Sequence, residues 1–338
     1  MTPRERLLKA LAGQQVDRPP VICPGGMMNA AIVEIMNNTG YKWPEAHADS
    51  ALMAKLAAAV HTYTGFENIG FPFCMTVEAE VLGSEVSYGS LACEPKVVGE
   101  RYGELAAVEE RDTTAMLGGG RVQTVLDAIR QSAEAYPEVP VIGNICGPVS
   151  LAASLVDPVA MLKGLRKDPA NAHRVLSYVS KFQAALAGAM IEHGATIIAI
   201  ADPTSTGEIL GPAMFEEYAV RYLNEVINAV HNRSTKVILH ICGRMNSVRR
   251  LIPELKADAV SVDAVVNLPK LKNDFPELIT MGNISTYLLQ DGPADKVALT
   301  AQKLVEEGVD IISPACGLST ATPINMIRAM TRAVKQEK

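Results

Sequence analysis

Short apolar runs alternate with longer amphipathic stretches along most of this sequence. The short runs have the length of buried strands, and the stretches between them repeat apolar residues every three to four positions, as helices do. We predict strands at residues 20–23, 68–72, 139–144, 196–201, 236–241, 259–262, 279–283 and 310–313. We predict the longer helices at residues 120–136, 171–193, 214–231, 293–308 and 322–336.

The first residues carry a helix signal of their own. Thr2 is followed by Pro3 and Glu5, which is the pattern of a capping box with proline at the first helical position. The helix is expected to run to about Leu11, because Gly13 ends the pattern. An N-terminal helical extension therefore precedes the first predicted strand.

Eight strand–helix units predict an α/β protein with a closed parallel barrel, the (β/α)8 or TIM barrel. The alternative is an open doubly wound sheet, but residues 24–27 after the first strand lack the glycine spacing of its nucleotide-binding turn. Residues 76–99 nearly alternate in polarity, which predicts a β-hairpin excursion after the second strand. No repeat or linker divides the sequence, so we predict one domain over residues 1–338.

Composition restricts the classes of function. A net charge of −6 and a pI near 5.6 indicate no overall basic surface, so we predict no nucleic-acid partner. No run approaches the ~20 apolar residues of a membrane span, and no signal-peptide pattern follows Met1. These features predict a cytoplasmic protein without a membrane partner. Six cysteines in that reducing compartment favour metal binding or catalysis over disulfides.

Three residues with metal-binding chemistry follow the fifth and eighth predicted strands. Side chains alternate along a strand, so His240 and Cys242 should point to the same side at its carboxyl end. Cys316, followed by Gly317, stands just beyond the eighth strand. Barrel enzymes place their active sites at this end, and one histidine with two thiolates suits zinc with its fourth position open.

Two other interpretations remain open from the residues alone. A buried cysteine often packs as a small hydrophobic residue, and a histidine at a strand end is usually just hydrogen-bonded. A cysteine nucleophile with a histidine base is the second alternative, although two residues on one strand seldom form such a pair. The zinc hypothesis has a definite chemical consequence, because a thiol entering the open position would be held as the nucleophilic thiolate.

Motifs along nearly the whole chain resemble the uroporphyrinogen decarboxylase superfamily. They are Arg4–Gly13, Val16–Val21, Gly147-Pro148, Ala199–Pro203, His240–Gly243, Gly282-Asn283 and Pro314–Gly317. Within that superfamily, the His-x-Cys pattern with a late cysteine is similar to the methylcobamide:coenzyme M methyltransferases. The resemblance implies a zinc barrel that transfers a methyl group from a methylated corrinoid to a thiol.

The resemblance also implies roles for individual residues. His240, Cys242 and Cys316 match the zinc ligands. Asp202 matches an acid at the end of the fourth strand, expected to face the mouth or else to cap the following loop. Glu80 matches an acid expected to complete the metal shell or else to lie on a solvated hairpin.

Further residues near strand ends are predicted to bind substrate. Asn144 and Asn283 are expected to line the pocket, Met27 and Met28 to offer an apolar wall to the corrinoid, and Arg244 to bind an anionic group of the acceptor.

Two departures bear on the substrate. Residues 23–29 contain none of the arginines with which the decarboxylases grip porphyrin carboxylates, and they also lack the Thr-Gln-Thr run of the coenzyme M enzymes. We therefore expect methyl transfer from a corrinoid carrier protein, docked at the barrel mouth, to a thiol such as coenzyme M. The alternative function is the reverse direction, in which a methyl group from an ether or amine is loaded onto cobalt(I).

Overall fold

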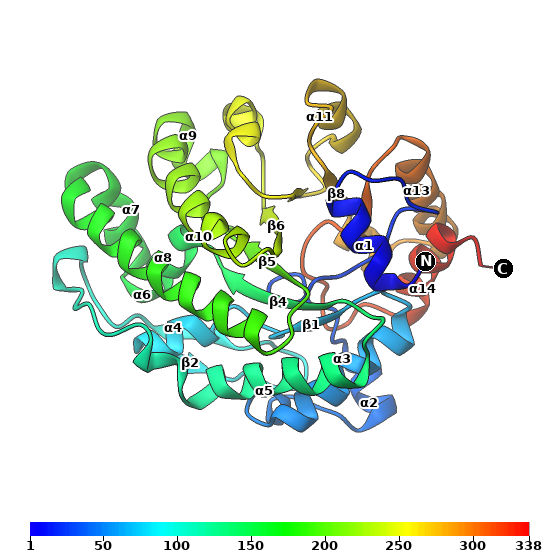
Figure 1. Cartoon of the computed structure of the whole chain (residues 1–338), viewed down its shortest axis with the longest axis horizontal. Coiled ribbons are helices and arrows are strands. Elements are labelled where there is room, and N and C mark those ends of the chain that lie inside the picture. The colour runs from blue at the N-terminus through cyan, green and yellow to red at the C-terminus, as the bar shows by residue number, and fades with distance from the viewer. Residues whose placement is uncertain (338) are drawn as a thin grey trace.

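A curled parallel sheet forms the centre of the computed structural model, which describes residues 1–337 (Figure 1). Seven strands pair in the order β1-β4-β5-β6-β7-β8-β9, all in parallel. The strands are β1 Ile69–Phe71, β4 Val141–Cys146, β5 Ile197–Ala201, β6 Lys236–Ile241, β7 Ala259–Val262, β8 Thr280–Ile284 and β9 Ile311–Pro314. Each lies within two residues of its predicted range, which confirms the (β/α)8 barrel prediction for these seven units.

The predicted first strand, residues 20–23, closes the ring between β9 and β1. Val21 forms a parallel bridge with Ile312, whose amide also donates to the Pro20 carbonyl at 2.9 Å. On the other side, Glu67 N donates to Val21 O, and the Asn68 side chain bonds both backbone groups of Cys23. This segment therefore takes a strand's place with only one regular bridge, because side-chain hydrogen bonds replace part of the ladder.

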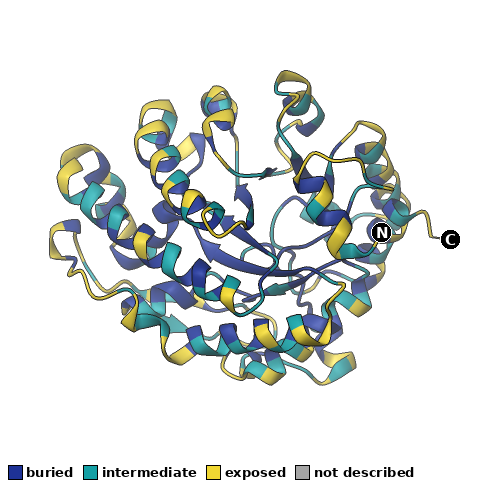
Figure 2. Ribbon diagram, in the orientation of Figure 1, coloured by how far each residue is buried: buried dark blue, intermediate teal, exposed yellow. Residues whose placement is uncertain are grey.

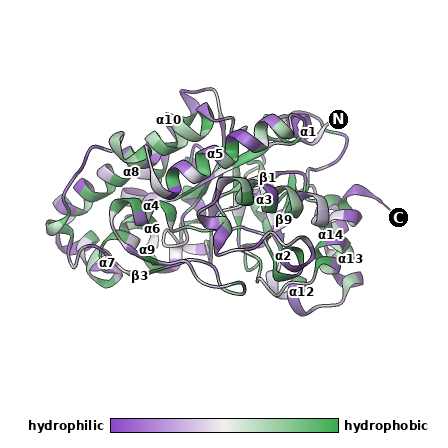
Figure 3. Ribbon diagram, turned by 90° about the horizontal axis from the view of Figure 1, so that it is seen from below, coloured by the Kyte–Doolittle hydropathy of each residue, from purple (hydrophilic) through white to green (hydrophobic). Residues whose placement is uncertain are grey.

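Helices surround the sheet, with buried faces toward the strands and exposed faces toward solvent (Figure 2). The helices alternate apolar and polar positions, as Figure 3 shows from below. They are α1 Pro3–Leu11, α2 Val33–Thr39, α3 Ser50–Thr64, α4 Val77–Leu82, α5 Gly120–Ala135, α6 Pro148–Leu155, α7 Pro158–Lys167, α8 Pro169–Glu192, α9 Gly207–Met214, α10 Arg221–His231, α11 Leu268–Asp274, α12 Thr286–Asp291, α13 Ala294–Glu306 and α14 Ile324–Lys335. A π-helical turn, Phe215–Val220, joins α9 to α10.

The predicted excursion is a hairpin in its second half only. Strands β2 (Glu85–Ser87) and β3 (Lys96–Gly99) pair antiparallel, as predicted. The preceding part was predicted as β structure and is instead helix α4. Its Val77, Ala79 and Leu82 are buried, because helical spacing packs this side inward, and Gly83 ends the helix in the left-handed conformation.

The N-terminal extension confirms its sequence signal. Thr2 and Glu5 form the reciprocal capping box of α1. Arg4 N then donates to the Glu138 carbonyl just before β4, and Arg6 reaches Glu67 just before β1. Helix α1 therefore packs beside the amino ends of the strands, opposite the predicted site.

No helix within the described residues is long and apolar enough to cross a membrane.

Candidate metal centre

The three predicted ligands meet at the carboxyl end of the barrel. His240 is the penultimate residue of β6, Cys242 follows that strand, and Cys316 follows β9. His240 Nε2 lies 3.1 Å from Cys242 Sγ, which lies 3.2 Å from Cys316 Sγ. The ligand atoms all fall within 4.8 Å of one another. Barrel closure thus brings together two thiols that are 74 positions apart in the chain.

Ser261 on β7 selects the tautomer of His240. Ser261 Oγ donates to Met28 Sδ at 3.7 Å and lies 3.0 Å from His240 Nδ1. With its own proton directed at Met28, the hydroxyl accepts the Nδ1 proton, so the Nε2 lone pair faces the two sulfurs. This is the arrangement in which a neutral histidine binds a metal, its orientation held by a second residue.

A glycine behind each cysteine lets the backbone turn tightly at the site. Gly243 has φ +74°, in the left-handed region that side chains other than glycine seldom adopt. At Gly317, a Cβ atom would stand 2.2 Å from the Met27 carbonyl oxygen. Larger residues at these positions would therefore displace Cys242 and Cys316 from each other.

The hydrogen bond between the two thiols changes their pKa values in opposite directions. The hydrogen bond with Cys242 lowers the pKa of Cys316 below its usual value, against the opposing effect of burial. The same hydrogen bond, with burial and the negative charges of Cys316 and Asp263, raises the pKa of Cys242. One sulfur is thus readily ionised, while a cation is needed to ionise the second.

This donor set fits zinc. One imidazole lone pair and two sulfurs converge from the ends of two strands, and His240 is held in the metal-binding tautomer. A divalent cation would also remove the electrostatic penalty on the second thiolate. His240, Cys242 and Cys316 would hold the ion, and a three-residue set leaves a coordination position for substrate.

Asp202 lies at the predicted strand end, but its carboxylate is engaged elsewhere. It is fully buried and accepts hydrogen bonds from Val149 N and from both the amide and the hydroxyl of Ser150, at 3.2, 2.9 and 2.6 Å. These groups belong to the first turn of α6, where a carboxylate satisfies free amides. Burial raises the pKa of Asp202, against the hydrogen bonds from Ser150. Its catalytic role stays a prediction.

Glu80 lies on α4 and pairs with the guanidinium of Arg121. Arg121 Nη1 donates to Glu80 Oε2 at 2.9 Å, and the Tyr88 hydroxyl donates to Oε1 at 2.8 Å. These residues line a pocket of about 490 Å³ between α4 and α5. The candidate metal-binding cluster among the described residues consists of His240, Cys242 and Cys316, without Glu80. Its role in the metal shell stays a prediction.

The two predicted asparagines brace loops at the mouth. Asn144 is buried and donates through Nδ2 to the carbonyls of Pro24 and Phe71, at 2.8 and 3.1 Å. Asn283 donates through Nδ2 to the carbonyls of Asp263 and Val266, at 2.9 and 2.8 Å. Both side-chain amides therefore hold backbone at strand ends, and substrate contact stays a prediction.

The remaining predicted residues lie at different depths. Met28 is 2% exposed, and its sulfur accepts a hydrogen bond from the Ser261 hydroxyl. Met28 therefore contacts the residue that orients His240. Met27 is half-buried, with its carbonyl against Gly317. Arg244 is exposed just after Cys242, and its amide donates to Glu208 Oε2 at 3.2 Å. Their substrate roles stay predictions.

Sequence reasoning missed several polar residues around the centre. Ser261 carries no motif, yet its hydroxyl is hydrogen-bonded to His240. Asp263 accepts from Gly243 N at 3.4 Å, and Cys23 has its pKa raised by burial and by the charge of Cys316. The one available signal was position, because each residue lies at the carboxyl end of a strand or strand-like segment.

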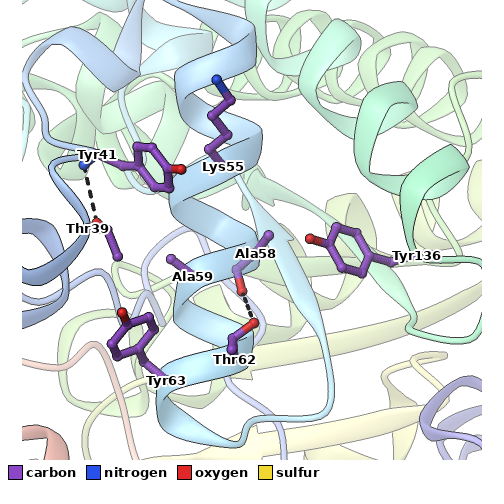
Figure 4. A pocket seen from close by; sticks show the side chains of 8 residues that line it. All are labelled: Thr39, Tyr41, Lys55, Ala58, Ala59, Thr62, Tyr63 and Tyr136. Carbon is purple, nitrogen blue, oxygen red and sulfur yellow. Dashed lines mark hydrogen bonds between the residues drawn. The ribbon is translucent and has the colours of Figure 1, made fainter.

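A separate pocket of about 380 Å³ lies on the outer side of α3 (Figure 4). Its lining includes Tyr41, Tyr63 and Tyr136, with Lys55 over the Tyr41 ring at 5.9 Å. None of the predicted site residues lines it. This pocket is therefore separate from the candidate metal centre.

The chain matches known proteins over its full length. The family model described as uroporphyrinogen decarboxylase (URO-D) matches residues 2–337. Methylcobamide:CoM methyltransferase MtbA from Methanosarcina acetivorans is 35% identical, covering 100% of this chain and 98% of the relative. Methylcobamide:CoM methyltransferase MtaA from Methanosarcina barkeri is 33% identical, with coverage of 98% and 97%.

A solved structure extends this agreement to three dimensions. It is described as a methyltransferase from Methanosarcina mazei and superposes with a TM-score of 0.92 at 32% identity, covering 99% of both chains. The chain belongs to the uroporphyrinogen decarboxylase family.

Proposed function

We propose that this protein is a zinc-dependent methyltransferase that moves a methyl group from a methylated corrinoid to a thiol such as coenzyme M. The convergence of His240 Nε2, Cys242 Sγ and Cys316 Sγ within 4.8 Å carries the proposal. The names of full-length relatives support the donor and the acceptor. The uroporphyrinogen decarboxylase activity of the wider family is disfavoured, because residues 23–29 contain no arginine to bind porphyrin carboxylates.

The residues of the centre have distinct tasks in this proposal. His240, Cys242 and Cys316 hold the zinc ion, which when bound lowers the pKa of an acceptor thiol. Ser261 orients His240 and keeps its proton on Nδ1. Gly243 and Gly317 permit the close backbone turns that aim the two cysteines at each other.

The reaction is a displacement at the methyl carbon. The acceptor sulfur forms a bond to carbon while the cobalt–carbon bond breaks, and the electron pair of that bond stays on cobalt as cobalt(I). Holding sulfur and methyl group in line converts a bimolecular encounter into an oriented step. We propose that a corrinoid carrier protein docks transiently on the carboxyl-end face, because both reactants must meet there.

The transfer direction follows from the ligand types. Two thiolate ligands donate charge to zinc and reduce its strength as a Lewis acid, which suits thiol activation better than the cleavage of an ether or amine. We therefore favour thiol methylation over the loading of cobalt(I). We also propose that the protein acts in the cytoplasm and as one domain; its predicted boundary at residue 338 lies outside the described residues.

Two measurements on one purified sample test this function. Metal analysis should give about one zinc per chain, and methylcobalamin mixed with coenzyme M should show the spectral change to cobalt(I) only when protein is present. Zinc without turnover would reject coenzyme M as acceptor and direct the assay to other thiols and to the reverse reaction. Turnover by a zinc-free sample would overturn the proposal.

A further inference from the structure

A floor of small residues makes room for the pocket on the outer side of α3. Ala58 and Ala59 line this pocket but are only 9% and 7% exposed, because the larger side chains around them rise above the helix surface. The cavity of about 380 Å³ lies within the range of ~300–1,000 Å³ that small-molecule sites occupy. A larger residue in place of either alanine would fill part of this space.

Three tyrosine side chains form the walls of the pocket. Tyr41 follows α2, Tyr63 belongs to α3 and Tyr136 follows α5, so residues distant in the chain surround the alanine floor. Figure 4 shows the Tyr41 and Tyr136 hydroxyls pointing toward this part of α3 from opposite sides. Within residues 1–337, none of the three hydroxyls forms a hydrogen bond to another residue. Their hydrogen-bonding groups are therefore available to a ligand.

Backbone hydrogen bonds hold these tyrosines in place. The Tyr41 amide donates to Thr39 Oγ1 at 3.2 Å, and Arg328 Nε donates to the Tyr63 carbonyl at 2.6 Å. The Tyr136 amide donates into the last turn of α5 at 2.9 Å. The walls are thus preformed, which reduces the entropy that a ligand would have to overcome on binding.

The charge at the pocket has one sign. Lys55 stands at the rim, with Nζ 5.9 Å from the centre of the Tyr41 ring, and forms no ion pair with any of residues 1–337. No aspartate or glutamate belongs to the lining among these residues. The ammonium group of Lys55 would attract an anion and repel a cation.

We propose that this pocket binds a small planar anion. An aromatic body lies over the alanine floor against the tyrosine rings, where it gains stacking and apolar burial, and its negative group pairs with Lys55. The tyrosine hydroxyls bond to polar atoms at the edge of the ligand. This site is independent of methyl transfer, since none of the residues assigned to the metal centre lines it.

Three naphthalenes of similar size and different charge test the ligand class. They are 2-naphthoate, 2-naphthalenemethanol and 2-naphthylmethylammonium, and calorimetric titration of the native protein at pH 7 and low salt gives each Kd. The anion should bind about 3–5-fold more tightly than the alcohol, the gain expected from one partly exposed ion pair. The cation should bind most weakly. Equal affinities, or tightest binding of the cation, would overturn the inference.

Filling the floor tests whether this pocket is the place of binding. Ala58→Leu should raise the Kd for 2-naphthoate by about 10-fold or more, because the leucine side chain occupies the space of the aromatic body. Ala51→Leu, an exposed position on α3 outside the pocket, should bind as the native protein does. Unchanged binding by Ala58→Leu would overturn the inference, because the ligand would then lie elsewhere.

Two further variants keep the test decisive if Ala58→Leu alters the fold. Tyr136→Ser removes an exposed part of the wall and should weaken all three naphthalenes alike. Lys55→Gln should abolish the preference for 2-naphthoate over the alcohol, whereas Lys9→Gln on α1 should retain it. A preference that survives in Lys55→Gln would overturn the role of this cation.

Sedimentation velocity distinguishes a ligand pocket from a contact between two copies of the chain. Native protein and Tyr136→Ser should sediment alike. A native dimer that Tyr136→Ser converts to a monomer would overturn the inference, because the tyrosines would then form an interface between copies.

Discussion

The two ends of the barrel hold polar clusters of opposite kinds. At the amino end, Arg6 binds Asp17 and Glu67, and Arg18 binds Glu67 as well. At the carboxyl end, His240, Cys242 and Cys316 direct three ligand atoms at one point. The first cluster pairs each of its charges with an opposite charge inside the protein, whereas the second directs the donor atoms of three side chains at one point.

The amino-end cluster ties the helical extension to the barrel. Arg6 bonds both carboxylate oxygens of Asp17 at 2.7 Å and Glu67 at 2.6 Å. Glu67 also accepts from Arg18 and from the Val21 amide at 3.0 Å, next to the segment that closes the ring. In this cluster each charged side chain already contacts an opposite charge. The comparison teaches that converging donor atoms, rather than charge as such, mark the candidate metal centre.

The largest effect is expected from removing a ligand at the carboxyl end. Cys316→Ala should abolish zinc retention and methyl transfer, because two donor atoms cannot hold zinc against buffer. Its unfolding midpoint in urea should stay close to that of the metal-free native protein. Metal analysis and the methylcobalamin assay check this, with Cys93→Ala, an exposed thiol, as control. Retained zinc in Cys316→Ala would contradict the ligand assignment.

The next effect is expected at the amino end and should be one of stability. Glu67→Ala should reduce the free energy of unfolding by about 3–5 kcal/mol, because it leaves buried Arg6 without one of its partners. Zinc content per folded molecule should be unchanged. Urea unfolding measures the change, with Asp127→Ala, in an exposed pair with Arg130, as the control expected within about 1 kcal/mol. A comparable loss in both variants would remove the distinction between the two kinds of pair.

Ser261→Ala should weaken the metal centre without destroying it. Loss of the hydroxyl frees His240 to rotate and to change tautomer, and such supporting residues typically change metal affinity by about 10–100-fold. Competition with a chelator of known zinc affinity measures the difference. Unchanged affinity would mean that β6 alone orients the imidazole.

The smallest effect concerns pH and again involves Glu67. Burial raises its pKa, but the hydrogen bonds from Arg18 and Val21 and the charges of both arginines outweigh this, so the pKa lies below 4.5. A carboxylate with a lowered pKa in the folded state stabilises the protein above the unfolded value and loses this contribution as pH falls through the folded value. The free energy of unfolding should therefore drop below about pH 4.5 more steeply in the native protein than in Glu67→Gln. Parallel curves from urea unfolding at several pH values would contradict this.

Local periodicity predicted most of the barrel. Runs such as residues 236–241 and 259–262 were located by their apolar character alone and coincide with β6 and β7. The excursion at residues 76–99 was harder to predict, because the order of polar and apolar residues in Val77–Leu82 fits both a strand and a short helix. Packing against α5 and α6, which no local pattern encodes, favours the helix.

The sequence by itself determined which side chains stand at the strand ends, because strand periodicity puts His240 and Cys242 on one side and the position of Cys316 after β9 puts it at the same edge. Only the tertiary structure decided which of these groups meet and which are engaged elsewhere. Asp202 turns to the first turn of α6, and Glu80 pairs with Arg121. The physical reason is that hydrogen-bond partners distant in the chain compete for each polar group, and ring closure settles that competition.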